Sequence, residues 1–230
     1  LHPDQKVRVQ GFEKIEKPFT DYFDLVISNI PFGDVAVFDP EFTGSQDPAR
    51  RSAAKTIHNY FFLKSLDAVR EGGIVAFITS QGVLDAPSNA PIREYMMRNA
   101  NLVGVARLPN NLFTDNAGTE VGSDLIILQK NTGKKQELYD FEELFVQTEK
   151  TPIGSFQNGY VGSIGMIPHS DLISGTDPYG KPAYKVMHRD GIGQMAEDLR
   201  EHMDIELYKL DKKLYEMHSL HPAQGKSTVT

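Results

Sequence analysis

Residues 23–33 read Phe-Asp-Leu-Val-Ile-Ser-Asn-Ile-Pro-Phe-Gly, and this stretch decides both the fold and the candidate site. Its apolar beginning suits a buried strand, which runs directly into an amide, a proline and an aromatic residue. At the carboxyl end of such a strand, the Asn29 side chain and a backbone carbonyl can accept hydrogen bonds from the amino group of a flat base. The ring of Phe32 can cover one face of that base. The stretch therefore predicts a binding site for a base with an exocyclic amine.

The composition narrows the class of protein. The chain has 230 residues, enough for one large domain or for a domain with an appendage. It has no cysteine, which excludes disulfides, thiolate metal sites and a cysteine nucleophile and suits a reducing cytoplasm. No apolar run approaches the length of a membrane span, so we expect a cytoplasmic protein without a membrane partner. The net charge of −7 argues against a globally basic nucleic-acid-binding protein but leaves local basic patches open. Because the first residue is Leu, we expect the chain to be a fragment.

The hydrophobic pattern alternates between strand-like and helix-like segments. Strands are expected over residues 6–9, 21–28, 74–79, 102–108 and 123–130, and helices over residues 57–69 and 91–98. Gly72 and Gly73 are expected to close the first helix, and residues 29–55 read as a long loop without periodicity. The strand over residues 21–28 is apolar on both faces, which is typical of a parallel strand with helices on each side. The order predicts an α/β fold with parallel strands and a terminal antiparallel pair.

The pattern weakens beyond Gly133, where we place the boundary between residues 1–133 and a smaller, irregular extension over residues 134–230. The extension is expected to contain a short helix over residues 138–146, an extended segment over 151–190, a helix near 195–217 and a disordered tail over 223–230.

Several segments between residues 6 and 130 resemble, in order, the C-terminal half of a class I methyltransferase domain. They are residues 23–33, 58–66, 70–80, 107–113 and 117–121. The first resembles motif IV of the N6-adenine DNA methyltransferases, (Asn/Asp/Ser)-Pro-Pro-(Tyr/Phe/Trp), with Ile30 in place of the first proline. The segments are similar to those of adenine methylases fused to helicases in large bacterial mobile-element proteins. The resemblance implies a Rossmann-like methyltransferase fragment whose partners are DNA and a helicase region of the same protein.

The resemblance assigns catalytic roles to the end of the first segment. The Asn29 side chain and the Ile30 carbonyl would accept hydrogen bonds from the N6 amine of a flipped adenine and stabilise positive charge on that nitrogen. Pro31 would fix the turn, and Phe32 would stack on the base. Without the first proline, Ile30 is expected to leave the loop one restraint looser.

The implied cofactor is S-adenosyl-L-methionine, whose pocket this chain would complete only in part. The family's glycine-rich first turn and the acidic end of its second strand have no counterpart before Lys6. Phe12 is expected to pack on the adenine ring of the cofactor. The isolated chain is therefore expected to be inactive and to bind the cofactor weakly or not at all.

Further residues are candidates for substrate binding. Phe113 is expected to be either a second aromatic contact for the flipped base or a member of the core. Arg50, Arg51 and Lys55 would contact DNA phosphates or lie on a solvated loop. His58, at the start of an amphipathic helix, is expected to be a cap or a surface residue.

Alternatives to adenine methylation in DNA stay open. RNA-base and glutamine-amide methylases also use Asn-Pro-Pro-aromatic, and a catalytically inert module that binds DNA or a partner would fit Ile30 and the absent cofactor motifs. In the family sheet, the strand that ends at Asn29 lies beside a first strand that this chain lacks. Because an exposed apolar edge promotes aggregation, we expect residues 6–10, a loop or self-association with a second copy to cover it.

Overall fold

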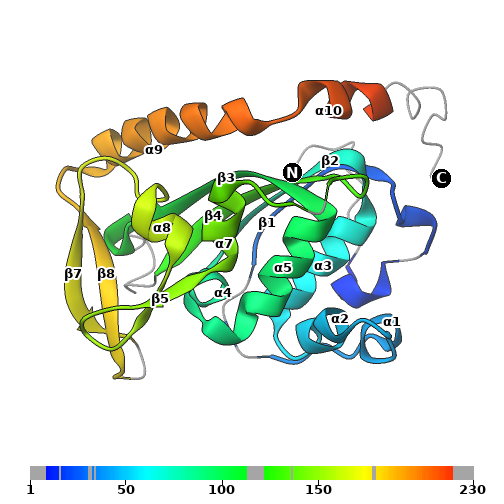
Figure 1. Cartoon of the computed structure of the whole chain (residues 1–230), viewed down its shortest axis with the longest axis horizontal. Helices are drawn as coiled ribbons and strands as arrows, with labels where there is room; N and C mark the ends of the chain where they lie inside the picture. The colour runs from blue at the N-terminus through cyan, green and yellow to red at the C-terminus, as the bar shows by residue number, and fades with distance from the viewer. Residues whose placement is uncertain are drawn as a thin grey trace.

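A computed structural model describes residues 9–15, 17–30, 33, 35–112, 122–135, 137–177 and 180–219. Its centre is a four-stranded sheet of order β1-β2-β4-β3 (Figure 1). The strands are β1 (Phe23–Asn29), β2 (Val69–Ser80), β3 (Ala100–Leu108) and β4 (Ser123–Lys130). β1 and β2 are parallel, whereas β4 is antiparallel to both of its neighbours. The predicted α/β fold with a terminal antiparallel pair is confirmed.

Two helices pack on one face of the sheet and form the main core with it. α3 (Ile57–Ala68) connects the parallel strands β1 and β2, and α5 (Ala90–Asn99) precedes β3. Phe62 of α3 meets Phe77 of β2 with ring centroids 5.1 Å apart, and both side chains are fully buried. Both helices lie where the hydrophobic spacing predicts them.

The glycine pair after α3 lies inside a strand. α3 ends at Ala68, because Val69 has an extended backbone and begins β2. The prediction that Gly72 and Gly73 close the helix is therefore wrong. Gly72 has a φ of 73°, and a Cβ on it would lie 2.5 Å from the carbonyl oxygen of Leu214. Glycine thus permits the close approach of a C-terminal helix to β2.

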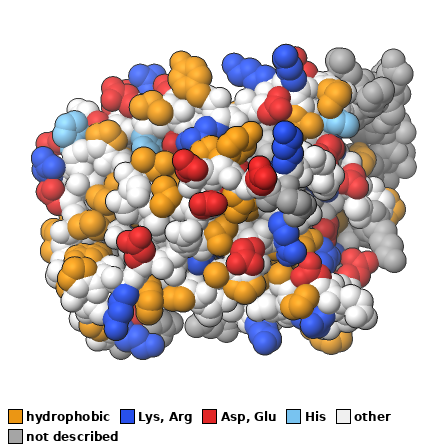
Figure 2. Space-filling model, viewed as in Figure 1, with side chains coloured by type: hydrophobic (Ala, Val, Ile, Leu, Met, Phe, Trp, Pro, Cys, Tyr) orange, Lys and Arg blue, Asp and Glu red, His pale blue; other side chains and the backbone are white. Residues whose placement is uncertain are grey.

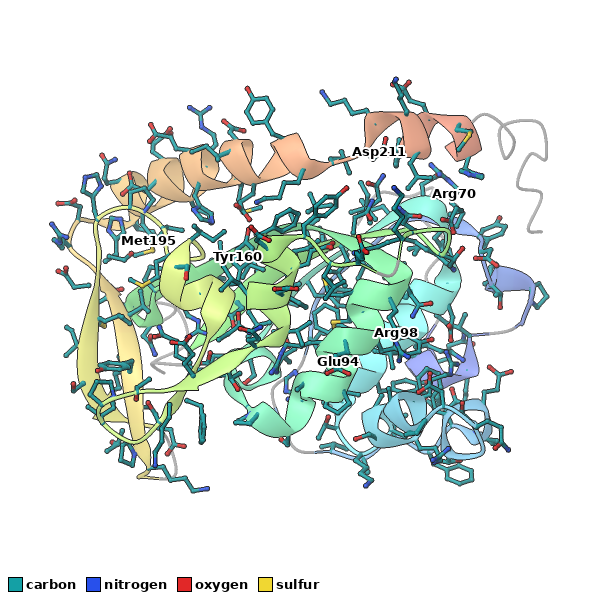
Figure 3. The ribbon with its side chains drawn as sticks, in the orientation of Figure 1. Arg70, Glu94, Arg98, Tyr160, Met195 and Asp211 are labelled. Atoms are coloured by element: carbon teal, nitrogen blue, oxygen red, sulfur yellow. The ribbon has the colours of Figure 1, made fainter. Side chains whose placement is uncertain are left out.

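The C-terminal helices run along the opposite side of the sheet, above β3 and β2 in Figure 1. They are α9 (Ile192–Glu206), the 3-10 turn η5 (Leu207–Lys209) and α10 (Lys212–Ser219), in place of the single helix predicted near 195–217. The break is held by the buried Gln129, whose amide exchanges two hydrogen bonds with the backbone of Asp211 (2.9 and 3.0 Å). Figure 3 labels Asp211 at this break, between the two helices.

β1 forms one edge of the sheet, and part of its apolar surface is exposed. Leu25 is 50% exposed and Ile27 is 72% exposed, so the predicted burial of this strand on both faces is wrong. No described residue pairs with the outer edge of β1. Residues 6–8 of the predicted first strand lie outside the described residues, and Val9 belongs to no strand. The covering of this edge stays a prediction.

Two short helices occupy part of the segment that was expected to be an irregular loop. They are α1 (Pro40–Thr43) and α2 (Pro48–Ala53). Each begins with proline after an aspartate N-cap, which suits the first turn of a helix. The Asp39 side chain accepts a hydrogen bond from the Glu41 N–H, and the Asp47 side chain accepts one from the Ala49 N–H.

Smaller elements follow the main sheet. They are α7 (Asp140–Val146), β5 (Thr148–Lys150), β6 (Phe156–Asn158), α8 (Gly159–Ser163), β7 (Ser170–Thr176) and β8 (Pro182–His188). α7 confirms the predicted short helix, and β7 and β8 form an antiparallel hairpin within the segment expected to be extended. The backbone N–H of Asn158 donates to Asp85 of α4 (Gly82–Asp85), which precedes α5. Such contacts join residues on both sides of residue 133, and the domain boundary placed there stays a prediction.

The remaining elements are 3-10 turns. They are η1 (Phe12–Lys14), η2 (Lys17–Phe19), η3 (Pro87–Asn89) and η4 (Asn110–Leu112). Residues 220–230, which include the tail expected to be disordered, lie outside the described residues. Among the helices that are described, none has the length and apolar character needed to cross a membrane.

Candidate active site at the carboxyl end of the parallel strands

Asn29 ends β1 at the carboxyl edge of the sheet, in register with Ile78 of β2. The residue is exposed, and its side chain makes no hydrogen bond to any described residue. A carboxamide in this position keeps its oxygen available for an external donor. This is the placement that the predicted base site requires.

Ile30 is firmly held, although it replaces a proline of the family motif. Its N–H donates a hydrogen bond to the carbonyl of Ile78 (2.9 Å), which continues the pairing of β1 with β2 by one residue. A proline has no N–H and could not make this bond. The side chain of Ile30 is 1% exposed and belongs to the main core. Ile30 itself is therefore anchored, whereas the expected looseness concerns the loop at residues 31, 32 and 34, which lie outside the described residues, and stays a prediction. The Ile30 carbonyl accepts no hydrogen bond from the described part of the chain.

His58 fixes the far side of the same loop. Its Nε2 accepts a hydrogen bond from the Gly33 N–H (3.4 Å), and its Nδ1 lies 3.0 Å from the hydroxyl of Thr79 near the end of β2. His58 as a whole residue is 8% exposed, so the expectation of a cap or surface residue is wrong. His58 of α3 thus links Gly33, in the segment after Asn29, to β2. Its place at the start of α3 carries no sequence signal for this role.

Three predicted site residues lie outside the described residues. They are Pro31, Phe32 and Phe113. Their roles in fixing the turn and stacking on a base stay predictions.

The three basic residues of the segment after the motif differ in their surroundings. Arg50 makes a two-pronged ion pair with Asp67 (2.8 and 2.9 Å) and also donates to the hydroxyl of Tyr95 (3.2 Å). Arg51 donates to two backbone carbonyls and is exposed, and Lys55 is exposed without an ion pair to any described residue. The N–H donors of Arg50 thus bind groups within the protein. Arg51 and Lys55 remain as candidates for the predicted phosphate contact.

Phe12 packs on α3. Its ring stacks on Phe61, with centroids 4.6 Å apart and planes 19° apart, and it meets the edge of Tyr60. One face of the Phe12 ring is therefore occupied within the protein. Its contact with a cofactor adenine stays a prediction.

A buried ionic cluster, which the sequence did not predict, lies at the same end of the strands as Asn29. Arg107 of β3 donates to both oxygens of Asp124 of β4 (2.5 and 3.1 Å) and to both oxygens of Asp85 of α4 (3.0 Å each). Arg107 is 2% exposed and Asp124 is fully buried. Burial acts to lower the pKa of Arg107, but the two carboxylates outweigh burial and raise this pKa above its ordinary value. The cluster holds the ends of β3, β4 and α4 together.

Two cavities among the described residues lie away from Asn29. One, of about 170 Å³, is lined by Asp67 and Ala68 at the end of α3. These residues lie where β2 begins, at the opposite end of the strands from Asn29. This cavity is smaller than the roughly 300–1,000 Å³ of typical ligand pockets. Another, of about 420 Å³, lies between the β5–β6 pair, α8 and the β7–β8 hairpin and includes no residue of β1. Neither of these two cavities includes Asn29 or its neighbours in β1.

The Ile30 hydrogen bond can be tested by restoring the family's proline. Ile30→Pro is expected to lower the free energy of unfolding of the chain by about 2–4 kcal/mol, because it removes the bond to Ile78 and leaves part of the buried space empty. Urea denaturation measures this loss. The control is Ile30→Val, which keeps the N–H and should cost only about 1 kcal/mol. A proline variant as stable as the valine variant would contradict the anchoring role of Ile30.

Comparison with known proteins places this chain in a family. The model of the family "N-6 DNA Methylase" matches residues 4–158, more than half of the chain. The protein "Defense against restriction protein B" of Escherichia phage P1 is 28% identical over 142 residues, which are 60% of this chain. The chain spans 6% of the length of that relative.

Likenesses to solved structures are distant. The M protein of the type I restriction enzyme EcoKI is 15% identical, with a TM-score of 0.42, over 85% of this chain and 50% of that one. A modification subunit assigned to a type I restriction enzyme of Vibrio vulnificus YJ016 is also 15% identical, with a TM-score of 0.40, over 78% of this chain and 40% of that one. Because both TM-scores are low, the assignment rests on the family model. The chain belongs to the N-6 DNA methylase family.

Proposed function

We propose that the full-length protein that carries this sequence transfers a methyl group from S-adenosyl-L-methionine to the N6 amine of adenine in DNA. Membership of the N-6 DNA methylase family supports this proposal. The observation that carries it is the exposed carboxamide of Asn29 at the end of β1, next to a backbone carbonyl that has no described donor.

Asn29 and Ile30 would act by orienting the amine. The lone pair of an aromatic amine is delocalised into the ring, so the nitrogen must be turned before it can attack a methyl carbon. Two acceptors, the Asn29 side-chain oxygen and the Ile30 carbonyl, would bind the two N–H groups and fix that orientation. They would also stabilise the positive charge that develops on the nitrogen. His58 and the Ile30–Ile78 hydrogen bond would hold these acceptors in place.

DNA would have to present an extruded base to this edge of the sheet, because an amine within the stacked duplex is out of reach. Arg51 and Lys55, exposed on the segment after the motif, would contact the flanking phosphates. Phe32 would stack on the extruded base. The methyl donor would be bound largely by parts of the full-length protein other than the residues described above, and a helicase region would be a further partner.

A catalytically inert module that binds DNA is the second candidate. The observation in its favour is that neither of the two cavities described above includes Asn29. The substitution at Ile30 does not favour it, because Ile30 is anchored by both its N–H and its side chain.

The identity of the product separates these functions. We expect the full-length protein, incubated with unmethylated DNA and labelled S-adenosyl-L-methionine, to form N6-methyladenine, identified by mass spectrometry of the DNA hydrolysate. Parallel reactions with RNA and with a glutamine-containing protein test the alternative substrates. Methylation of those substrates alone would redirect the proposal, and binding of DNA without any methylated product would support the inert module.

A further inference from the structure

Three side chains with metal-binding atoms meet at the start of α9, far along the chain from the candidate active site. His169 directly precedes β7, His188 ends β8, and Asp198 lies in the second turn of α9. Figure 3 labels Met195 one turn before Asp198, at the end of α9 that meets the β7–β8 hairpin. Histidine side chains reach the surface in this region of Figure 2.

The two imidazoles converge on one carboxylate oxygen. His169 Nδ1 lies 2.7 Å and His188 Nε2 lies 2.8 Å from Oδ2 of Asp198. The three ligand atoms all lie within 4.8 Å of one another. We propose that His169, His188 and Asp198 bind a divalent transition-metal ion of the zinc class.

The spacing fits such an ion after a small adjustment. Bonds of about 2.0–2.2 Å from zinc to nitrogen and oxygen place tetrahedral ligand atoms about 3.3 Å apart. The contacts to Asp198 would lengthen by about half an ångström, and the two imidazole nitrogens, now within 4.8 Å of each other, would also have to settle about 3.3 Å apart. His169 can move to make this adjustment, because its side chain is 52% exposed. Two imidazole nitrogens with one carboxylate suit zinc, cobalt or nickel, whereas magnesium and calcium prefer oxygen ligands alone.

Neighbouring groups orient both buried ligands. The Gln194 amide donates to Oδ1 of Asp198 (2.8 Å), which leaves Oδ2 for the ion. Nδ1 of His188 lies 3.1 Å from both the backbone N–H and the carbonyl oxygen of Asp190, so the tautomer of the ring decides which of the two it bonds. When Nδ1–H donates to that carbonyl, Nε2 presents its lone pair toward the ion. Metal-binding histidines and carboxylates are commonly held by such outer hydrogen bonds.

Two of the three ligand side chains are buried and the third is exposed, so the site is open to solvent on one side. The side chains of His188 and Asp198 are 0% and 2% exposed, whereas His169 faces solvent. The nearby cation Arg189 is paired with Asp171 (2.9 Å). A bound ion would keep a position for water on the side of His169 and would tie the β7–β8 hairpin to α9.

The experiment is a titration of the metal-free, untagged chain with zinc chloride at neutral pH, by calorimetry and by thermal unfolding. We expect one zinc ion per chain at micromolar affinity or better, together with a rise in Tm. His169→Ala, which changes an exposed side chain, is expected to abolish both effects, whereas the metal-free variant loses only one hydrogen bond to Asp198 and should stay folded. Gln194→Ala is expected to weaken zinc binding about 10- to 100-fold.

The matched control is His218→Ala, which removes an imidazole from α10 and should bind zinc like the wild type. The proposal would be overturned if His169→Ala had the same zinc affinity and the same Tm shift as the wild type. It would also be overturned if the wild type showed no saturable zinc binding. Either result would assign the cluster to a hydrogen-bond network that joins α9 to the hairpin. The proposal is independent of methyl transfer, so its failure leaves the proposed function untouched.

Discussion

Asn29→Ala in the full-length protein is expected to lower the rate of methyl transfer at least about 100-fold, because the variant loses an acceptor aimed at developing charge. The carboxamide lies at the end of β1 and makes no hydrogen bond to the described residues, so its removal should leave stability unchanged. The measurement is incorporation of a tritiated methyl group into DNA, combined with thermal melting of the same preparation.

The matched control for this prediction is Asn131→Ala. Asn131 directly follows β4, at the opposite end of the strands from Asn29. Its carboxamide donates a hydrogen bond to Asn101 (3.1 Å). This variant removes the same chemical group and should retain full methyl transfer. Equal incorporation by Asn29→Ala and the wild type would remove Asn29 from the mechanism.

Arg107→Met is expected to lower the free energy of unfolding of the chain by about 3–5 kcal/mol, the usual cost of removing one partner from a buried ion pair. The variant leaves Asp124 fully buried without the guanidinium that binds both of its oxygens. It also removes two hydrogen bonds to Asp85. Urea denaturation followed by circular dichroism measures the loss, since the chain has no tryptophan.

Two further variants serve as controls for Arg107→Met. Arg189→Met removes a guanidinium whose ion pair with Asp171 is more than half exposed, and should cost no more than about 1 kcal/mol. The double variant Arg107→Met/Asp124→Leu removes the stranded carboxylate and should recover part of the lost stability. A loss for Arg107→Met as small as that of Arg189→Met would contradict a structural role for the buried cluster.

The sequence predicts the central elements well, because their signals are local. A run of apolar residues that ends in Asn29 marks both the strand and the edge where its side chain emerges. The helix over α3 follows from apolar residues at helical spacing. α1 and α2 are too short for periodicity, although the Asp-Pro pairs that begin them are capping signals that could have been used.

Burial and pairing are less predictable, because they depend on segments that are distant in the sequence. The apolar residues Leu25 and Ile27 favour a strand but do not determine whether another element covers them. The hydrogen bond between Ile30 and Ile78 could not be inferred from a motif that expects proline.

The same reason explains the side-chain clusters that the sequence did not predict. Arg107 meets Asp85 and Asp124 only through the topology of β3, β4 and α4. His169, His188 and Asp198 are brought together by a hairpin and a helix, at spacings that match no recognised metal-binding motif.

The most direct test of the central claim is a structure of the full-length protein bound to its DNA and to a non-reactive analogue of S-adenosyl-L-methionine. The account predicts an extruded adenine whose N6 lies about 2.7–3.2 Å from both the Asn29 side-chain oxygen and the Ile30 carbonyl. An adenine that remains stacked in the duplex, or an Asn29 side chain turned inward onto its own backbone, would contradict it.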